Sequence, residues 1–328
     1  MSPLENYSLN KVLVANPRSR TFWNERLSYW ELPASNSEEQ QIQRAADMVR
    51  MALSSSNWLK NEGAIIKPQG SYHNNTNVRI ESDMDLRLTH PCIKLVYAND
   101  VVIDVANTFL GIYAAGRSYS DIAKDMKHVL IFELTKQFGS NNIDSTGKKA
   151  IRIKKCHGSR ADVDIVPCFN FKWVMWNATY GQYNVEDGIA ILSDDGAWTY
   201  NFPDQHYTNG VIKRTQTSCR FKRNVRMLKK LKDELVFSNI LQSKQVPSFL
   251  IESLTYAVDN VYFLNETDDR YGRLLRILYR MRELLSINSW VGNAKEINGI
   301  KYLFCPAQPW TVGDAQAFIL ESIKRLEA

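Results

Sequence analysis

Polar and apolar residues alternate in two short stretches of the first half of the chain. The sequence DMDLRL runs from Asp83 to Leu88, and ADVDIV runs from Ala161 to Val166. A period of two predicts β-strands, because successive side chains of a strand point to opposite faces. In both stretches the aspartates therefore face one side of a sheet and the apolar residues face the other.

Further strands are predicted at residues 64–68, 149–155 and within 96–113, and a hairpin at 188–201 with its turn at Asp195-Gly196. The strand that begins near residue 161 is expected to end at Pro167, because proline cannot donate to a ladder. A period of 3.6 predicts helices at residues 38–59 and 119–139. Ser37 and Gln40 have the spacing of a capping box for the first of these helices.

Helical periodicity dominates after about Pro203, with helices predicted inside residues 217–235, 247–261 and 271–286. The expected fold is therefore an α/β (α+β) half with a mixed sheet, followed by a helical half. We expect a core at 1–205, which includes a long N-terminal helix, and a helical lobe at 206–328.

Composition excludes several classes of protein. The 328 residues are 44% hydrophobic and 23% charged, and no run of about 18 apolar residues could span a membrane. The start of the chain lacks the pattern of a secretory signal, so a cytoplasmic protein is expected. The five cysteines are scattered without paired spacing, which argues against a zinc ribbon or a disulfide framework.

Positive charge is concentrated in one segment. The net charge is +6, and residues 213–232 hold a dense basic cluster. Such a cluster favours a polyanionic ligand, although a solvated helix face would have the same composition.

The aspartates suggest a catalytic site. Asp83 and Asp85 would lie about 7 Å apart on one face of a strand, where like charges repel unless a cation lies between them. Asp164, on the other alternating strand, would complete a set of oxygen ligands that suits Mg²⁺ or Mn²⁺. The turn at Gly70-Ser71 would let backbone N–H groups and a hydroxyl reach a phosphate. Each feature alone is more often a plain surface feature, whereas the combination favours metal-assisted catalysis on a nucleoside triphosphate.

The order of these features resembles the nucleotidyltransferase superfamily with a polymerase-β-like core. That order is Gly-Ser, a spacer, Asp-x-Asp, and then a distant strand aspartate that precedes two apolar residues and a proline. The segments FKRNVRMLKKLK and VPSFLIESLTYAV resemble the helical lobe of the bacterial cGAS/DncV-like nucleotidyltransferases, or CD-NTases. The resemblance extends from about Trp23 to Phe304. It implies a polymerase-β-like core and a helical lobe that closes a nucleotide cleft.

The resemblance also implies roles for individual residues. Gly70 and Ser71 would hold the triphosphate. Asp83 and Asp85 would bind both metal ions, and Asp164, with Asp162 as its rival, would help to activate the attacking hydroxyl.

Four further residues are implied in nucleotide binding. Lys229 and Ser248 would contact phosphate, and Phe249 would stack on a base, although Lys229 fits a solvated lysine and Phe249 a core aromatic equally well. Asn209 lies where an asparagine is associated with pyrimidine use, because a carboxamide pairs with uracil through a donor and an acceptor; a simple Asn-Gly turn is the alternative.

The resemblance implies an enzyme that joins nucleoside triphosphates into a cyclic di- or trinucleotide second messenger and releases pyrophosphate. A separate effector protein would read the product in antiphage defence. No zinc-ribbon insertion is present, so activation by DNA is not expected. We expect a monomer that binds no membrane. The alternatives are a nucleotidyltransferase that extends RNA 3′ ends, with the basic segment as an RNA track, and a catalytically inactive scaffold.

Overall fold

The computed structural model describes residues 19–78, 83–113, 116–242, 244–265 and 269–328. They form two compact units. The helical unit comprises the described part of residues 1–32 together with 213–295 and 302–328, and the sheet unit comprises 33–212 and 296–301. Within these described residues, no helix is both long and apolar enough to cross a membrane.

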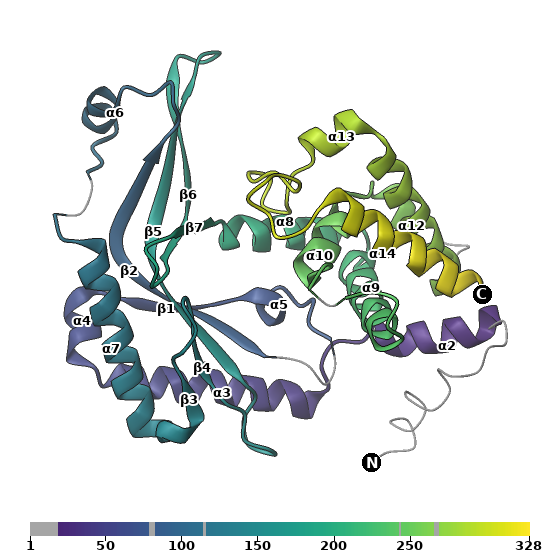
Figure 1. Ribbon diagram of the computed structural model, residues 1–328, viewed down its shortest axis with the longest axis horizontal. Coiled ribbons are helices and arrows are strands. Elements are labelled where there is room, and N and C mark those ends of the chain that lie inside the picture. Colours follow the sequence, from purple (N-terminus) through teal and green to yellow (C-terminus); the bar gives the residue numbers. More distant parts are fainter. Residues whose placement is uncertain (1–18, 79–82, 114–115, 243, 266–268) are drawn as a thin grey trace. The chain divides into compact units, whose positions relative to one another are not determined.

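A mixed sheet of seven strands, counted over the described residues, forms the centre of the sheet unit (Figure 1). Its main path has the order β1-β2-β5-β4-β3, while β6 pairs with β5 and β7 with β6. Only β2 and β5 run parallel among these pairs. The strands are β1 Ile65–Gln69, β2 Met84–Tyr97, β3 Ile143–Asp144, β4 Ile151–Ile153, β5 Val163–Asn177, β6 Gln182–Leu192 and β7 Trp198–Asn201.

One face of this sheet is covered by helices α3 and α7 (Figure 1). The apolar residues at the start of β2, Met84, Leu86 and Leu88, are buried there in a core that includes Val49 of α3 and Met126 of α7. The alternation in the sequence correctly predicted this division, which leaves Asp85 on the opposite face. The other helices of the unit are short. The helices that begin in this unit are α3 Asn36–Ser54, α4 Asn57–Glu62, α5 Gly70–His73, α6 Ile103–Leu110, α7 Tyr119–Phe138, η1 Ser140–Asn142 and α8 Pro203–Gln216, whose last turn belongs to the helical unit.

Three predictions about these elements were wrong. The helix expected at residues 38–59 is divided, because the Ser56 hydroxyl accepts a hydrogen bond from Leu59 N and starts α4 as a new helix. The capping box of α3 is formed by Ser35 and Glu38 instead of Ser37 and Gln40. Residues 103–110, expected within a strand, form helix α6, while β2 itself continues to residue 97.

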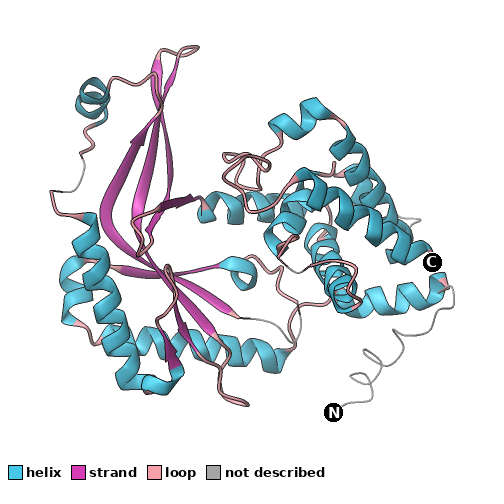
Figure 2. Cartoon of the chain, in the orientation of Figure 1, coloured by secondary structure: helices cyan, strands magenta, loops and turns pink. Residues whose placement is uncertain are grey.

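The strand expected to end at Pro167 continues to Asn177 as β5. Figure 2 shows how long β2, β5 and β6 are. On one side of β5, β4 pairs up to Ile165 and β6 pairs from Phe169, so Pro167 falls between the two partners. A missing N–H breaks no ladder hydrogen bond on that side, which is why proline is tolerated inside a strand here.

Helices make up the second unit, as the sequence predicted. They are α2 Arg20–Trp30, α9 Arg220–Phe237, α10 Ser248–Ala257, α11 Val261–Leu264, α12 Arg270–Ser286, α13 Asn288–Asn293 and α14 Val312–Glu327.

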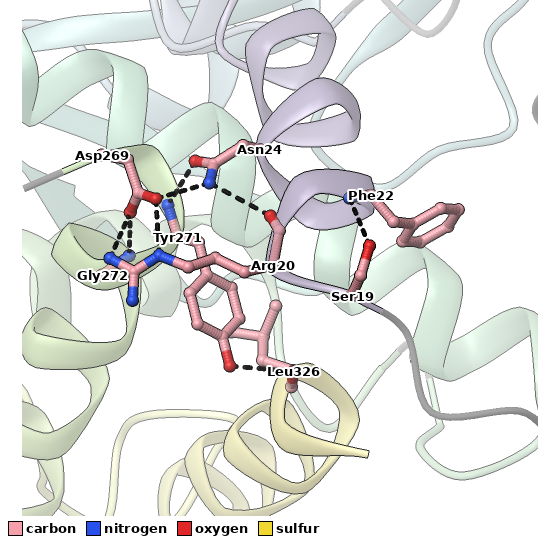
Figure 3. A network of polar contacts seen from close by, with 8 residues as sticks. All are labelled: Ser19, Arg20, Phe22, Asn24, Asp269, Tyr271, Gly272 and Leu326. Carbon is pink, nitrogen blue, oxygen red and sulfur yellow. Dashed lines mark hydrogen bonds and ion pairs between the residues drawn. The ribbon is translucent and has the colours of Figure 1, made fainter.

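Helix α2, although it was expected with the core, packs on α9 and α12 of the helical unit. Asp269, the N-cap of α12, holds it there (Figure 3). The Arg20 guanidinium donates to both oxygens of Asp269, at 2.7 and 3.0 Å, and Asn24 Nδ2 donates to one of them at 2.6 Å. Whether residues 1–205 act as one functional domain stays a prediction.

Candidate active site

The two aspartates of the Asp-x-Asp pattern stand at the start of β2. Asp83 directly precedes the strand and Asp85 is its second residue. Residues 79–82, before them, lie outside the described residues. Because Met84 and Leu86 are buried in the core, the alternation sends the Asp85 carboxylate to the face that α3 and α7 leave uncovered.

Gly70 gives the Asp85 carboxylate its place. Gln69 pairs with Asp85 across β1 and β2, and Gly70 follows with a φ of +73°. A Cβ carbon at position 70 would lie 1.9 Å from Asp85 Oδ2, so no other residue fits without displacing the carboxylate. Ser71 lies in the first turn of α5, and its carbonyl accepts from Thr76 N at 2.9 Å. The predicted Gly-Ser turn is therefore the beginning of a short helix against Asp85.

Parallel pairing of β2 with β5 brings the third aspartate to the same row. Asp164 is the register partner of Asp85, and Arg152 of β4 is the partner of Asp164 on its other side. Arg152 donates from Nε to Asp164 Oδ1 at 2.8 Å and from Nη2 to Oδ2 at 2.9 Å. Its Nη2 also lies 3.7 Å from Asp83 Oδ2. Arg152 was not singled out from the sequence. The alternation in KAIRIKK could have identified it, because Arg152 lies between two buried isoleucines and therefore points to the other face of β4.

Asp162, the rival candidate, lies just before β5. Its Oδ1 accepts a hydrogen bond from Lys155 N at 2.9 Å, and its carbonyl accepts from Met84 N at 2.9 Å. Burial raises the pKa of Asp83, and the negative charges of Asp162 and Asp164 raise it further, against the opposing effect of Arg152. These three carboxylates therefore repel one another, which is the condition that a bound cation relieves.

The chemistry of this row fits a divalent cation. All three candidate ligands are carboxylates, and oxygen ligands are those that Mg²⁺ and Mn²⁺ prefer. As the side chains stand, no group of three or more His, Cys, Asp or Glu within the described ranges is gathered to hold a metal ion. Asp164 instead turns both oxygens toward Arg152. The donor set therefore suits a divalent cation, and in the observed arrangement the Asp164 oxygens pair with Arg152.

A cavity of about 310 Å³ lies on the same face, farther along β2. Arg87 lines it, only 2% exposed, and donates from Nη2 to Asp204 Oδ1 at 2.6 Å. Its Nε and Nη1 are buried and have no hydrogen-bond partner among the described residues. Gln205 Oε1 in the same lining is likewise buried and unpaired, while its Nε2 donates to Asp187 O at 2.5 Å. Buried polar atoms without partners carry a free-energy cost that water or a ligand can offset.

Asn209 lines a neighbouring cavity of about 440 Å³, which also includes Asp204 and Gln205. It lies inside α8, so the simple Asn-Gly turn that was the alternative reading is not present. Its Nδ2 donates to Ile297 O at 2.7 Å, which leaves its carbonyl oxygen and its second amide hydrogen for another partner.

Three predicted nucleotide-binding residues belong to the helical unit. Lys229 is buried in α9, 3.6 Å from Glu252 Oε2, and burial lowers its pKa, so it is not a solvated lysine. Ser248 is exposed at the first position of α10. Phe249 beside it is half-buried, with its ring 6.0 Å from that of Trp310.

The basic segment 213–232 is not a solvated helix face. Several of its cationic side chains are at least nine-tenths buried, namely Lys213, Lys222, Arg226 and Lys229. Cations in such positions cannot serve as an RNA track without a rearrangement, because a track needs exposed charge.

Comparisons with known proteins agree with this geometry. A family model described as the cGAS/DncV-like nucleotidyltransferase C-terminal helical domain matches residues 208–327. A cyclic dipyrimidine nucleotide synthase CdnE of Legionella pneumophila is 31% identical over 304 residues, 91% of this chain and 96% of that protein. A protein with the same description from Cecembia lonarensis is 30% identical over 310 residues, 93% of this chain and 99% of its own length.

The fold is also similar to that of a solved relative. The Elizabethkingia meningoseptica CdnE cyclic dinucleotide synthase, determined with GTP and Apcpp, has a TM-score of 0.72 and 27% sequence identity. The match covers 93% of this chain and 99% of that one. The relatives thus share the architecture while their descriptions name different bases.

Proposed function

The chain belongs to the cGAS/DncV-like nucleotidyltransferases, and we propose that it condenses two nucleoside triphosphates into a cyclic dinucleotide with release of pyrophosphate. The observation that carries this proposal is a row of three carboxylates. Asp85 and Asp164 are register partners, Asp83 directly precedes β2, and the Asp85 carboxylate lies against the backbone of Gly70. The relatives named above, described as cyclic nucleotide synthases, support the kind of product.

In each round of the proposed reaction a ribose hydroxyl of one nucleotide attacks the α-phosphorus of the other. A new P–O bond forms, the bond between the α-phosphorus and the bridging oxygen to the β-phosphate breaks, and pyrophosphate leaves. A second round in the opposite sense closes the ring, so two triphosphates give one cyclic product and two pyrophosphates. The hydroxyl proton passes to a carboxylate or to solvent.

The aspartates would hold the divalent cations and align the reactants. Mg²⁺ or Mn²⁺ bound there would polarise the α-phosphate and favour ionisation of the attacking hydroxyl. Asp83 and Asp85 would contact the triphosphate side, and Asp164, which register places beside Asp85, would orient the hydroxyl. Gly70 and Ser71 would hold the triphosphate, since the backbone of Gly70 carries no side chain between it and Asp85.

The cavity beside Arg87 suits the base of the attacking nucleotide. Arg87 is two residues after Asp85, which is about 7 Å along a strand and within reach of a nucleoside whose ribose lies at the aspartates. Its unpaired N–H groups and the unpaired Gln205 oxygen complement a base edge with an acceptor next to a donor. Every nucleobase has such an edge, so these groups support binding of a base without selecting one. Asn209, in the adjoining cavity, would favour uracil in this position.

Three residues of the helical unit stay predicted nucleotide contacts. Lys229 and Ser248 would contact phosphates, and Phe249 would stack on a base. The substrates are cytoplasmic metabolites, so we place the reaction in the cytoplasm, with a monomer as the active form. A separate effector that reads the product would give the enzyme its role in antiphage signalling.

Turnover of labelled nucleotides tests the proposal. The pure protein is incubated with each nucleoside triphosphate, singly and mixed, with Mg²⁺ or Mn²⁺, and the products are treated with phosphatase and identified by mass. We expect a phosphatase-resistant cyclic dinucleotide that Asp83→Ala/Asp85→Ala abolishes. Asp100→Ala/Asp104→Ala, which removes two exposed carboxylates at α6, is the matched control and should retain it. Extension of an added RNA without any cyclic product would instead support the RNA-modifying alternative.

The base site is tested in the same assay with two variants. Gln205→Leu should raise the KM for the attacking nucleotide, because the base loses an acceptor, and Asn209→Ser should lower the share of uracil. An unchanged KM in the first variant and an unchanged product composition in the second would place the base elsewhere.

A further inference from the structure

Arg152 engages both oxygens of Asp164, a carboxylate proposed to bind a divalent cation. We propose that Arg152 is a resident counter-cation that competes with the metal for Asp164, so that metal binding is weaker while the guanidinium remains in place. This inference rests on the proposed metal-dependent function, and it adds a control of metal binding by a residue of β4.

The geometry of the pair sets the two cations in competition. The guanidinium donates to Asp164 Oδ1 at 2.8 Å and to Oδ2 at 2.9 Å, so one lone pair of each carboxylate oxygen is engaged in a fork-like contact. A metal ion would use the same oxygens as ligands. A guanidinium at this distance would repel a metal ion on the same carboxylate, because both carry positive charge.

Register, and not a chance rotamer, holds Arg152 in this place. Arg152 pairs with Asp164 across β4 and β5, and its neighbours Ile151 and Ile153 are buried on the other face. Cross-strand partners of opposite charge attract on one face of a sheet. The backbone of β4 thus presents a positive charge to the acidic row for as long as the sheet is folded.

Arg152 also acts on a second aspartate. Its Nη2 is 3.7 Å from Asp83 Oδ2, and its charge opposes the effects that raise the pKa of Asp83. A single guanidinium thereby partly compensates two like-charged carboxylates of the row, which weakens their mutual repulsion.

The side chain is free to leave. It is 47% exposed, so the guanidinium can swing into solvent without burying an unpaired charge. Ion pairs this exposed contribute little to stability, so release of the guanidinium from Asp164 requires no large free energy. A triphosphate next to the row would offer the released guanidinium a new anionic partner.

Binding of Mn²⁺ without nucleotide tests the competition directly. Free Mn²⁺ is measured by electron paramagnetic resonance during titration of the wild type, Arg152→Gln, Arg152→Lys and Lys148→Gln. We expect Arg152→Gln to bind Mn²⁺ on the order of tenfold more tightly, because a positive charge next to the metal position is removed. Arg152→Lys should fall between the two, since an ammonium ion cannot engage both oxygens in a fork. Lys148→Gln removes the same charge where the partner is Asp195, and should match the wild type.

Equal or weaker Mn²⁺ binding by Arg152→Gln would overturn the proposal and make the arginine a support for Asp164. If Arg152→Gln does not fold, Arg152→Lys decides, since binding no tighter than in the wild type also contradicts competition. The measurement needs no turnover. Tighter Mn²⁺ binding by Arg152→Gln, without cyclic product from the wild type, would support the competition and reject the proposed synthase function. Cyclic product from the wild type, with unchanged Mn²⁺ binding by Arg152→Gln, would support the synthase function and reject the competition.

Discussion

The carboxylate of Asp85 lies against the backbone of Gly70, so closely that a Cβ carbon there would come within 1.9 Å of Oδ2. A glycine is therefore required at position 70 because of the Asp85 carboxylate, independently of any contact between Gly70 and a phosphate. The two halves of the motif form one packed structure.

Replacing Gly70 should disrupt catalysis more than folding. Gly70→Ala places a methyl group on the Asp85 carboxylate and forces alanine to a φ of +73°, a conformation that costs about 1–2 kcal/mol. We expect product formation to fall about 100-fold or more, because the carboxylate must move. Gly181→Ala is the control, since Gly181 has a φ of +60° and nothing within 4 Å of an added Cβ. An equal loss of activity in both variants would show that backbone strain alone is responsible.

The choice between Asp164 and Asp162 can be settled by paired substitutions. Asp164 is in register with Asp85, whereas Asp162 is bonded to the backbone N–H of Lys155. Asp164→Asn should lower kcat by about 100-fold or more, as expected for a group that acts on the attacking hydroxyl. Asp162→Asn should lower it by less than about tenfold. Steady-state rates at saturating nucleotide measure both, and the opposite order would make Asp162 the third carboxylate.

Substitution of Lys229 can separate a structural role from contact with phosphate. Lys229→Met alone would remove a cation that lies 3.6 Å from the buried Glu252 carboxylate, so we expect a loss of about 3 kcal/mol in unfolding free energy. Lys229→Met/Glu252→Met removes both charges and should recover most of that stability. The KM for nucleoside triphosphate is then measured in the double variant. A raised KM would support contact with phosphate, and an unchanged KM would reduce Lys229 to a partner of Glu252.

The stability of the protein should rise between about pH 8 and pH 10.5 because of Lys213. Burial lowers the pKa of this lysine from 10.5 to about 8, and its Nζ donates to Val258 O at 2.6 Å. In this range the unfolded chain binds more protons than the folded chain, so the free energy of unfolding increases with pH. Lys213→Met should flatten the rise in urea-unfolding midpoints measured across this range. A slope that stays the same in the variant would assign the effect to another group.

Local pattern was sufficient for much of the fold. The alternation around Asp85 predicted which face of the strand is buried, and the helical stripes predicted α9, α10 and α12. These features depend on side-chain direction within one element, which a short stretch of sequence determines. Errors arose where a few residues decide an element, as at Ser56, whose hydroxyl starts a new helix in a sequence of continuous helical periodicity.

What the tertiary structure decided are relationships between distant segments. Parallel pairing of β2 and β5 sets Asp85 beside Asp164, and antiparallel pairing of β4 with β5 sets Arg152 on the other side of Asp164. No local signal specifies these registers, because each depends on the packing of whole strands against a common core. The same holds for Lys229, whose sequence context resembles a charged surface helix and whose burial against Glu252 follows only from the packing of α9 on α10. The sequence by itself determined which residues could perform the chemistry, and the long-range packing decided which of them meet.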